Sequence, residues 1–245
     1  MVYDTGRQRV ICFGGSDEKG PLRETWEWDG GEWRLASMFG PSARTSTAMA
    51  FDSLRGVTVL FGGSASGQSG ETWEWDGVQW RLRSTQGPPP RSRHTMAFDS
   101  RRGVTVLFGG IGGTIYDDTW EWNGTSWRPI SDAGPPARFR HAMAFDEVTG
   151  SIVMFGGESF GGFILGDTWV LTGESWQQRV IPGPSARALH AMAYDPLRSV
   201  VMLYGGSAAG STRSDTWEYK QGEWVQRFPT GPRTLDGHGL AYDVA

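Results

Sequence analysis

The stretch "ETWEWDG" at residues 24–30 recurs unchanged at residues 71–77, and it decides how this chain folds. Altered copies follow as "DTWEWNG" at 118–124, "DTWVLTG" at 167–173 and "DTWEYKQ" at 215–221. A second tryptophan stands seven residues after the first one in every copy, at Trp33, Trp80, Trp127, Trp176 and Trp224. Self-similarity at a fixed period is the signature of a repeat protein. The chain is therefore a series of five related units.

Each unit also contains a double glycine. The sequence "FGG" or "YGG" ends at Gly15, Gly63, Gly110, Gly157 and Gly206, in steps of 48, 47, 47 and 49 residues. Short alternating or apolar runs separated by Asp, Asn and Gly predict four strands joined by tight turns in each unit. In the third unit the runs are "RHTMAFD" (93–99), "GVTVLFGG" (103–110), "DDTWEWN" (117–123) and "SWRPI" (126–130). No helical period competes with this pattern.

Both faces of these strands bear residues suited to burial. His94, Met96 and Phe98 alternate on one face of the first strand of the third unit. Thr95 and Ala97 on the other face are small enough for a neighbouring sheet to approach closely. Four-stranded units repeated radially, each covered by its neighbours, form a β-propeller. We therefore expect an all-β fold in which residues 1–245 form a single five-bladed β-propeller of four-stranded antiparallel blades.

The repeat resembles that of the kelch family. Its signature is a double glycine that closes the second strand and spaced aromatic residues later in the blade, and the resemblance covers the whole chain five times. The family more often has six or seven blades, so the resemblance leaves the size of the ring open.

The two ends of the chain bear on how the ring closes. The N-terminal "VYDTGRQRV" (2–10) contains the tail of a first strand and then a second strand, whereas "GHGLAYD" (237–243) is a full first strand. We expect the C-terminal strand to complete the N-terminal blade and to close the ring as a monomer. A start in mid-blade also fits a segment cut from a longer protein or an engineered chain, and both interpretations stay open.

Composition narrows the classes of partner. The formal net charge is −4 and the sequence pI is near 5.6, whereas a nucleic-acid-binding domain is usually basic. No apolar run approaches the roughly 18 residues of a membrane span. The single cysteine, Cys12, permits neither an intramolecular disulfide nor a thiolate zinc cluster, and we expect it to be a small buried core residue. We expect neither nucleic acid nor membrane as a partner, and the cellular compartment stays open.

The histidines and glycines do not indicate a metal or a cofactor. All four histidines, His94, His141, His190 and His238, occupy one repeat position. Because this position shares a strand face with apolar residues, we expect the histidines to point between blades and to donate to a nearby acceptor rather than to ring a metal ion. The double glycines precede no helix, so they are interpreted as turn residues rather than a phosphate site.

The glutamates of the repeated motif have a structural interpretation. If the hairpin turn falls at Gly77 and Val78, Glu74 lies opposite Arg81 on the next strand. The same offset predicts the pairs Glu27 with Arg34 and Glu121 with Arg128. Both partners change together in the fourth unit, to Val170 and Gln177, although Glu218 in the fifth unit faces Val225. Cross-strand ion pairs of this kind stabilise a sheet.

Two sets of arginines are candidates for ligand binding. One set stands three residues before the histidine position, at Arg44, Arg91, Arg138 and Arg187; Leu235 breaks the series, with Arg233 nearby. The second set, Arg93 and Arg140, occurs in two units only. Alternating strand directions place both sets at one mouth of the channel. The kelch resemblance implies that such arginines grip acidic peptides, for which a planar guanidinium is suited. Alternatively, they pair with the acids that begin the third strands, Glu24, Glu71, Asp118, Asp167 and Asp215.

The loops after the double glycines vary between units while the strands do not. Variable loops on a rigid frame commonly bear the binding surface of a repeat protein. The third and fourth loops supply apolar residues beside Arg93 and Arg140, among them Tyr116, Phe160 and Phe163. An apolar patch rimmed by arginine is typical of a partner site. The alternative is that these loops only cap the channel.

We therefore expect a non-catalytic binding scaffold without a cofactor, with an acidic peptide or small anion bound at this mouth. The candidate ligand-binding residues are Arg44, Arg91, Arg93, Arg138, Arg140, Arg187, Arg233, Tyr116, Phe160 and Phe163.

Three alternatives stay open. An enzyme of the sugar mutarotase or lyase type is one, for which Asp17, Glu18, Asp117 and Glu158 are the only acids on this face that occur in a single blade. The others are a sugar binder that uses exposed indoles and a propeller scaffold without a ligand.

Overall fold

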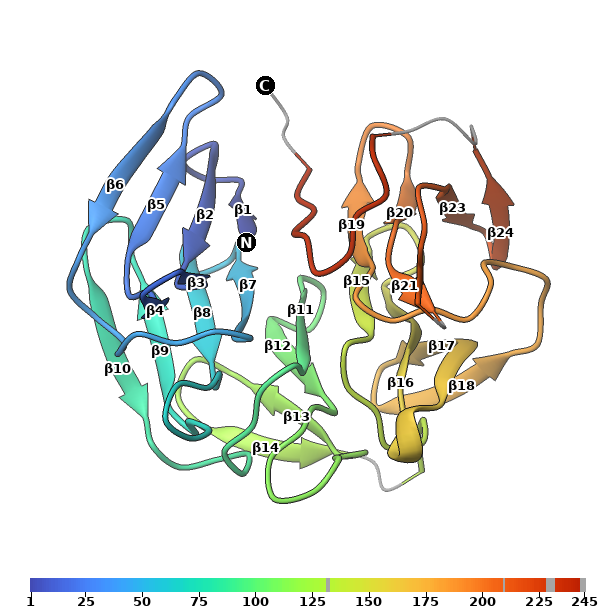
Figure 1. Cartoon of the computed structure of the whole chain (residues 1–245), viewed down its shortest axis with the longest axis horizontal. Coiled ribbons are helices and arrows are strands. Elements are labelled where there is room, and N and C mark those ends of the chain that lie inside the picture. Colours follow the sequence, from blue (N-terminus) through green and yellow to red (C-terminus); the bar gives the residue numbers. More distant parts are fainter. Residues whose placement is uncertain (131–132, 209, 228–231, 243–245) are drawn as a thin grey trace.

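The structure is a computed structural model and describes residues 1–130, 133–208, 210–227 and 232–242. It contains five four-stranded antiparallel sheets, here called blades 1 to 5 in chain order (Figure 1). Within each blade, neighbouring strands follow one another along the chain. The predicted β-propeller of five four-stranded antiparallel blades is thus confirmed.

The strands have the following bounds. Blade 1 contains β1 (Val2–Asp4), β2 (Arg9–Phe13), β5 (Thr25–Trp28) and β6 (Trp33–Ser37). Blade 2 contains β7 (Ala48–Asp52), β8 (Val57–Phe61), β9 (Thr72–Trp75) and β10 (Trp80–Ser84). Blade 3 contains β11 (Thr95–Asp99), β12 (Val104–Phe108), β13 (Thr119–Trp122) and β14 (Trp127–Ile130). Blade 4 contains β15 (Ala142–Asp146), β16 (Ser151–Glu158), β17 (Ile164–Thr172) and β18 (Ser175–Arg179). Blade 5 contains β19 (Ala191–Asp195), β20 (Val200–Tyr204), β23 (Thr216–Lys220) and β24 (Glu223–Gln226).

The remaining elements are short and belong to the loops that follow the double glycines. They are the hairpin of β3 (Ser16–Asp17) and β4 (Gly20–Pro21), the hairpin of β21 (Ser207–Ala208) and β22 (Ser211–Thr212), and the 3₁₀ turn η1 (Phe160–Gly162). Among the described residues, the structure has no helix with the length and hydropathy of a membrane span.

The blades are arranged around one axis, with the first strand of each blade innermost (Figure 1). Along this inner layer β1 contacts β7, β7 contacts β11, β11 contacts β15, and β15 contacts β19. Blades 2 to 5 are therefore each stacked on the blade that precedes them in the sequence.

Each blade has two different faces, which we name from blade 3. Its indole face bears Met96, Leu107, Trp120, Trp122 and Trp127, which share one side of the sheet by register. Its acceptor face bears Ala97, Val106, Thr119 and Glu121, which share the other side. In all four core clusters, the acceptor face of one blade packs against the indole face of the next. The bulky and small faces expected from strand alternation thus complement each other across the blade interfaces.

A repeated hydrogen bond crosses every one of these four interfaces. The tryptophan in the first two residues of the fourth strand donates its indole N–H to the threonine hydroxyl of the preceding blade's motif. The pairs are Trp80 to Thr25 (2.8 Å), Trp127 to Thr72 (2.7 Å), Trp176 to Thr119 (3.0 Å) and Trp224 to Thr168 (2.9 Å). A buried indole N–H needs a partner because an unmade hydrogen bond is costly away from water. The threonine of the motif is therefore an interface residue.

The double glycine permits close approach of the next loop. Gly62 has φ = +68°, and a Cβ atom placed on it would lie 2.5 Å from the carbonyl oxygen of Arg91. Gly109 repeats this geometry against the carbonyl of Arg138. Only glycine meets both the backbone conformation and the contact. This accounts for the repeated glycine as a turn residue, as the sequence predicted.

The C-terminal segment differs from the prediction. Blade 1 takes its inner strand from β1, at the N-terminus, so within the described residues the C-terminal segment does not complete this blade. Instead, the described residues 232–242 follow blade 5 and run between blades 5 and 1 (Figure 1). The reason is that residues 1–4 already repeat the second half of a first strand and pair with β2.

Candidate functional site

The repeated arginines lie inside the blades. The guanidinium of Arg91, with no exposed surface, donates to both carboxylate oxygens of Asp118 at 2.5 and 2.8 Å. It also donates to the carbonyl oxygens of Pro89 and Gly109. The equivalent ion pairs are Arg44 with Glu71, Arg138 with Asp167 and Arg187 with Asp215. The sequence left two roles open for these arginines, ligand binding and pairing with the acids that begin the third strands. In the structure they form the ion pairs with these acids.

These ion pairs shift the acids toward the charged form. Burial alone would raise the pKa of Asp118, but the hydrogen bonds and charge of Arg91 outweigh it and hold this pKa below its ordinary value. The same balance lowers the pKa of Asp167 beside Arg138 and of Asp215 beside Arg187. The four arginines thus tie the loop that enters a blade to the third strand of that blade.

The histidines are buried between blades. The rings of His94, His141 and His190 pack edge-on against Phe61, Phe108 and Phe155, at centroid distances of 5.5 to 5.6 Å. Nε2 of His141 lies 2.7 Å from the Thr95 hydroxyl, which fits the expected hydrogen bond.

The other two buried histidines lie beside backbone acceptors, His94 at Phe61 and His190 at Phe155. Within the described residues, neither ring nitrogen of His94 or His190 makes a hydrogen bond of standard geometry. Burial, followed by the charge of Arg91, lowers the pKa of His94 to about 3, and burial with Arg187 does the same for His190. The described residues hold no cluster of three or more His, Cys, Asp or Glu side chains arranged for a metal ion.

The glutamates of the motif lie in the expected register but pair differently. Glu27, Glu74 and Glu121 oppose Arg34, Arg81 and Arg128, as predicted. Only the pair of Arg128 with Glu121 forms, at 2.7 Å, whereas Arg34 pairs with Glu32 and Asp29 and Arg81 pairs with Asp76. Two of the three predicted ion pairs are therefore wrong, because nearer acids reach these exposed arginines first.

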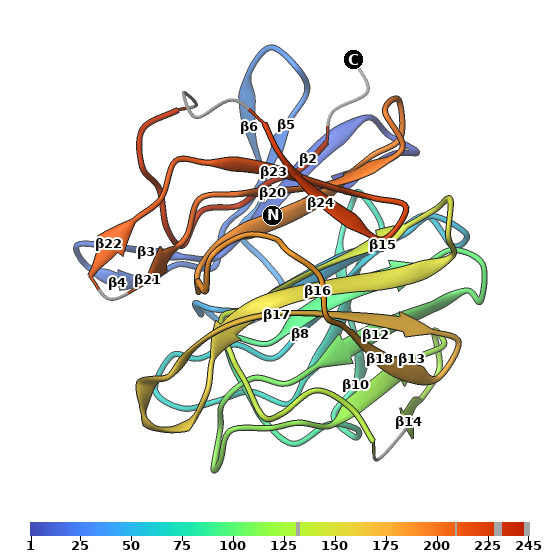
Figure 2. The same cartoon turned by 90° about the vertical axis from the view of Figure 1, so that its right-hand side faces the viewer.

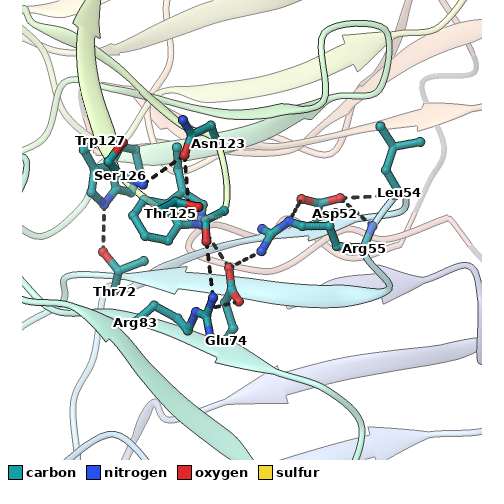
Figure 3. Close-up of polar contacts among 12 residues, drawn as sticks. Asp52, Leu54, Arg55, Thr72, Glu74, Arg83, Asn123, Thr125, Ser126 and Trp127 are labelled. Atoms are coloured by element: carbon teal, nitrogen blue, oxygen red, sulfur yellow. Dashed lines mark hydrogen bonds and ion pairs between the residues drawn. The ribbon is translucent and has the colours of Figure 1, made fainter.

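The glutamates instead accept hydrogen bonds from a turn arginine and from the next blade. Glu74 accepts from Arg55 at 2.6 Å and from the indole of Trp122 in blade 3 at 3.0 Å, and it pairs with Arg83 at 3.2 Å. Arg83 also donates to the carbonyl of Gly124 in blade 3. Figure 3 shows Glu74 between Arg55 and Arg83. Glu27 likewise accepts from Arg7 and from Trp75. The motif thus builds the interfaces between blades.

The second set of arginines lies at the channel mouth, in a row of residues joined by backbone hydrogen bonds that we call the girdle. Ser46, Arg93, Arg140 and Leu189 occupy one repeat position, and all have φ between 55° and 61°. The amide of Arg93 donates to the carbonyl of Ser46, that of Arg140 to Arg93, and that of Leu189 to Arg140, each at 2.9 to 3.0 Å. This conformation is uncommon for residues other than glycine. The girdle holds the two arginines beside each other on successive blades.

The two girdle arginines differ in their charge partners. The guanidinium of Arg140 donates to the Glu158 carboxylate at 2.7 Å and lies 5.3 Å from the ring centre of Phe139. Arg93 lies over the same ring at 5.9 Å and is exposed. Within residues 1–130, 133–208, 210–227 and 232–242, Arg93 forms no ion pair. Arg93 therefore presents a positive charge to solvent at this mouth.

The aromatic loop residues do not all share this exposure. Phe160 and Phe163 project from the loop between β16 and β17 and are 83% and 73% exposed. Tyr116 is half-buried, with its ring 3.9 Å from the Arg91 guanidinium. Arg233 is exposed, and its carbonyl accepts a hydrogen bond from Tyr204. Figure 2 shows that the loops with β3 and β4, with β21 and β22, and between β16 and β17 project on the same side of the molecule.

The sequence interpretation did not find a cavity inside the ring. It has a volume of about 420 Å³, and Met49, Met96, Met143 and Met192 line it from successive inner strands. The lining extends to Ser53, Glu147 and Pro196 in the turns after these strands, so the cavity lies toward the face opposite to Arg93. The repeated "MAF" or "MAY" triplet was the signal for it.

The acids of the enzyme alternative make turn or surface contacts. Asp17 accepts from the amides of Lys19 and Gly20 in the β3–β4 turn, and Glu158 pairs with Arg140. Glu18 and Asp117 are exposed.

Comparison with known proteins adds no family. The sequence matches neither a protein-family model nor a curated protein. The fold is compatible with a kelch-type propeller and fits a binding scaffold in general.

Proposed function

We propose that the protein is a non-catalytic binding scaffold whose ligand is an acidic peptide, bound at the channel mouth between Arg93 and the loop of Phe160 and Phe163. The observation that carries this proposal is the exposed guanidinium of Arg93, which lacks a carboxylate partner among the described residues. We propose further that the chain is a kelch-type propeller, on the repeated double glycine and spaced tryptophans.

A continuous chain of contacts supports one site. Arg93 and Arg140 lie over Phe139, and the Phe139 backbone exchanges two hydrogen bonds with Glu158. Glu158 precedes by two residues the loop residue Phe160. An apolar surface beside an arginine fork suits a segment with alternating acidic and apolar side chains.

Glu158 gives the site an internal competitor. Its carboxylate occupies Arg140 in the free protein, so a ligand carboxylate engages Arg93 first and Arg140 only by displacing Glu158. Arg44, Arg91, Arg138 and Arg187 are excluded from this proposal because their guanidinium groups are buried in ion pairs.

Fluorescence anisotropy with a labelled peptide of alternating glutamate and leucine tests the proposal. Arg93→Gln should weaken binding about tenfold, since a hydrogen bond to a charged group contributes about 1.5 kcal/mol. Glu158→Gln should strengthen binding by freeing Arg140. Arg81→Gln is the matched control, because Arg81 is exposed on an outer strand and its loss changes the net charge equally.

The controls separate this site from general charge attraction. A peptide with glutamine in place of glutamate should not bind, and citrate should compete if a small anion suffices. Equal affinity of the Arg93→Gln and Arg81→Gln variants, or no binding of the acidic peptide at all, would contradict the proposal and favour a scaffold without this ligand.

A further inference from the structure

Among the described residues, no other blade packs on the indole face of blade 1 or on the acceptor face of blade 5. On the indole face of blade 1, Trp33 is 45% exposed, whereas Trp80 at the same position of blade 2 is 8% exposed. On the acceptor face of blade 5, Met202 and Thr216 are half-buried, although Val153 and Thr168 at the same positions of blade 4 are buried.

A hollow of about 650 Å³ lies over the acceptor face of blade 5. Its lining consists of Arg198, Val200, Met202, Thr216, Glu218, Lys220 and Arg227. These residues come from β20, β23 and the segments next to them, so the hollow is the uncovered side of one sheet.

Blade 5 presents the same polar groups as a completed interface. Thr216, Glu218 and Arg227 occupy the repeat positions of Thr72, Glu74 and Arg83 in blade 2. In blade 2 these three groups bind two indoles and a backbone carbonyl of blade 3: Trp127, Trp122 and Gly124. Glu218 is already held by Arg198 at 2.5 Å and Arg227 at 2.7 Å, as Glu74 is by Arg55 and Arg83. Among the described residues, no indole donates to Thr216 or Glu218.

Blade 1 presents the complementary half. Trp28, Trp33 and Gly30 occupy the positions of Trp122, Trp127 and Gly124 in blade 3. The two indoles lie against each other, with centroids 5.7 Å apart, and neither donates a hydrogen bond to another described residue. Cys12 on this face is half-buried, whereas Leu60 at its position in blade 2 is fully buried. The expectation that Cys12 is a buried core residue is therefore wrong, because no other blade of the described residues packs on its face.

The C-terminal segment continues the repeat between these two faces. His238 packs edge-on against Tyr204 at 5.5 Å, as His94 packs against Phe61. The amide of Gly206 donates to the carbonyl of Leu235 at 2.8 Å, and the amide of Gly237 donates to Leu189, which extends the girdle. Residues 240–242 line the central cavity together with Met1 and the four inner strands that supply Met49, Met96, Met143 and Met192. This segment thus holds an inner position of its own, distinct from β1.

We propose that the space between blades 5 and 1 is a docking site for one more sheet of this repeat. The occupant is a three-stranded antiparallel sheet that completes a sixth blade on residues 238–242. Its two indoles bind Thr216 and Glu218 of blade 5, and its own threonine and glutamate accept from Trp33 and Trp28 of blade 1. The four completed interfaces define this chemistry.

Extension of the chain tests the proposal. Residue 243 aligns with Asp99, so residues 100–130 of blade 3, appended after residue 243, supply the three missing strands with Trp122 and Trp127 on the correct face. The probe is Cys12, the only cysteine of the unextended chain. We expect fast labelling of Cys12 in the unextended chain and labelling slowed by about tenfold or more in the extended chain, because docking suppresses exposure. In the matched control, W122A and W127A are made only in the appended copy of residues 100–130, and this extension should not protect Cys12 from labelling.

Three results would overturn the proposal. In the first, Cys12 of the unextended chain is labelled as slowly as a cysteine at the fully buried position 60, introduced as Leu60→Cys in a Cys12→Ser chain without the extension. The second is a concentration-dependent dimer by sedimentation that protects Cys12, which would make a second copy the occupant. The third is an intrachain disulfide in a Trp33→Cys, Thr216→Cys, Cys12→Ser monomer that forms as readily as in a Trp80→Cys, Thr25→Cys, Cys12→Ser monomer. Blades 1 and 5 would then meet directly.

Discussion

The interface between blades 2 and 3 and the uncovered faces of blades 1 and 5 contain the same side chains in different surroundings. Trp127 donates to Thr72 in a closed interface, whereas Trp33 and Thr216 at the same repeat positions lack each other and any described substitute. Local sequence therefore fixes which face of a blade bears indoles and which bears acceptors. Whether those groups become core depends on the next blade.

The largest effect should come from contacts that lie within one blade and do not depend on a neighbour. Arg91→Met in blade 3 and Arg187→Met in blade 5 each leave a partly buried aspartate without its partner, so each should lower the free energy of unfolding by about 3 to 5 kcal/mol. Urea unfolding followed by tryptophan fluorescence measures this. A loss in blade 3 only would show that these ion pairs also depend on the covering blade.

The next effect separates a closed interface from an open one. Trp127→Leu removes a large side chain from between two blades together with its bond to Thr72 and should cost about 3 kcal/mol. Trp33→Leu removes a half-exposed side chain and should cost about 0.5 kcal/mol or less. The two variants have the same chemical change at the same repeat position. Equal losses in urea unfolding would contradict the uncovered indole face.

A pH-dependent effect, small near neutral pH, should come from the histidines between closed blades. Burial holds the pKa of His94 and His190 at about 3, and burial also lowers that of His141. The unfolded chain binds protons at these histidines below about pH 6.5, whereas the folded chain does not, so stability falls as the pH drops from 6.5 toward 3. His94 and His190 each contribute up to about 1.4 kcal/mol per pH unit in this window, and His141 acts in the same direction.

His94→Thr provides the test, because Thr47 occupies this position in blade 2. Urea unfolding at several pH values should show a slope reduced by about one proton in the variant. An unchanged slope would mean that His94 becomes protonated in the folded protein.

Much of the fold follows from sequence because alternation and repeat length are local properties. The four strands, their faces and the register of Glu74 with Arg81 are predictable from spacing alone. The partner of Glu74 is not, since Arg55 reaches it from a turn and Trp122 from another blade. The exposure of Cys12 also could not be predicted, because it depends on the absence of a covering sheet.

In the candidate site, too, the position of a residue could be predicted from the sequence but its contacts with distant segments could not. The sequence pattern predicted both arginine sets at one mouth, Arg93 and Arg140 in two units only and the set of Arg91 in four. Sequence could not tell that Arg91 is enclosed by Asp118 and Gly109, because enclosure depends on the path of two loops. The inner cavity was missed because its methionines and alanines also fit the packing between blades.

Hydrogen exchange of the indole N–H groups, followed by NMR with labelled tryptophan, tests the central claim most directly. The claim is that the same interface forms between each of the four pairs of successive blades, whereas the indole face of blade 1 and the acceptor face of blade 5 stay uncovered. The N–H groups of Trp80, Trp127, Trp176 and Trp224 should exchange slowly because each is bonded to a threonine of the preceding blade. That of Trp33 should exchange at the rate of an exposed indole. Protection of Trp33 equal to the other four would show that its face is covered and would contradict the account.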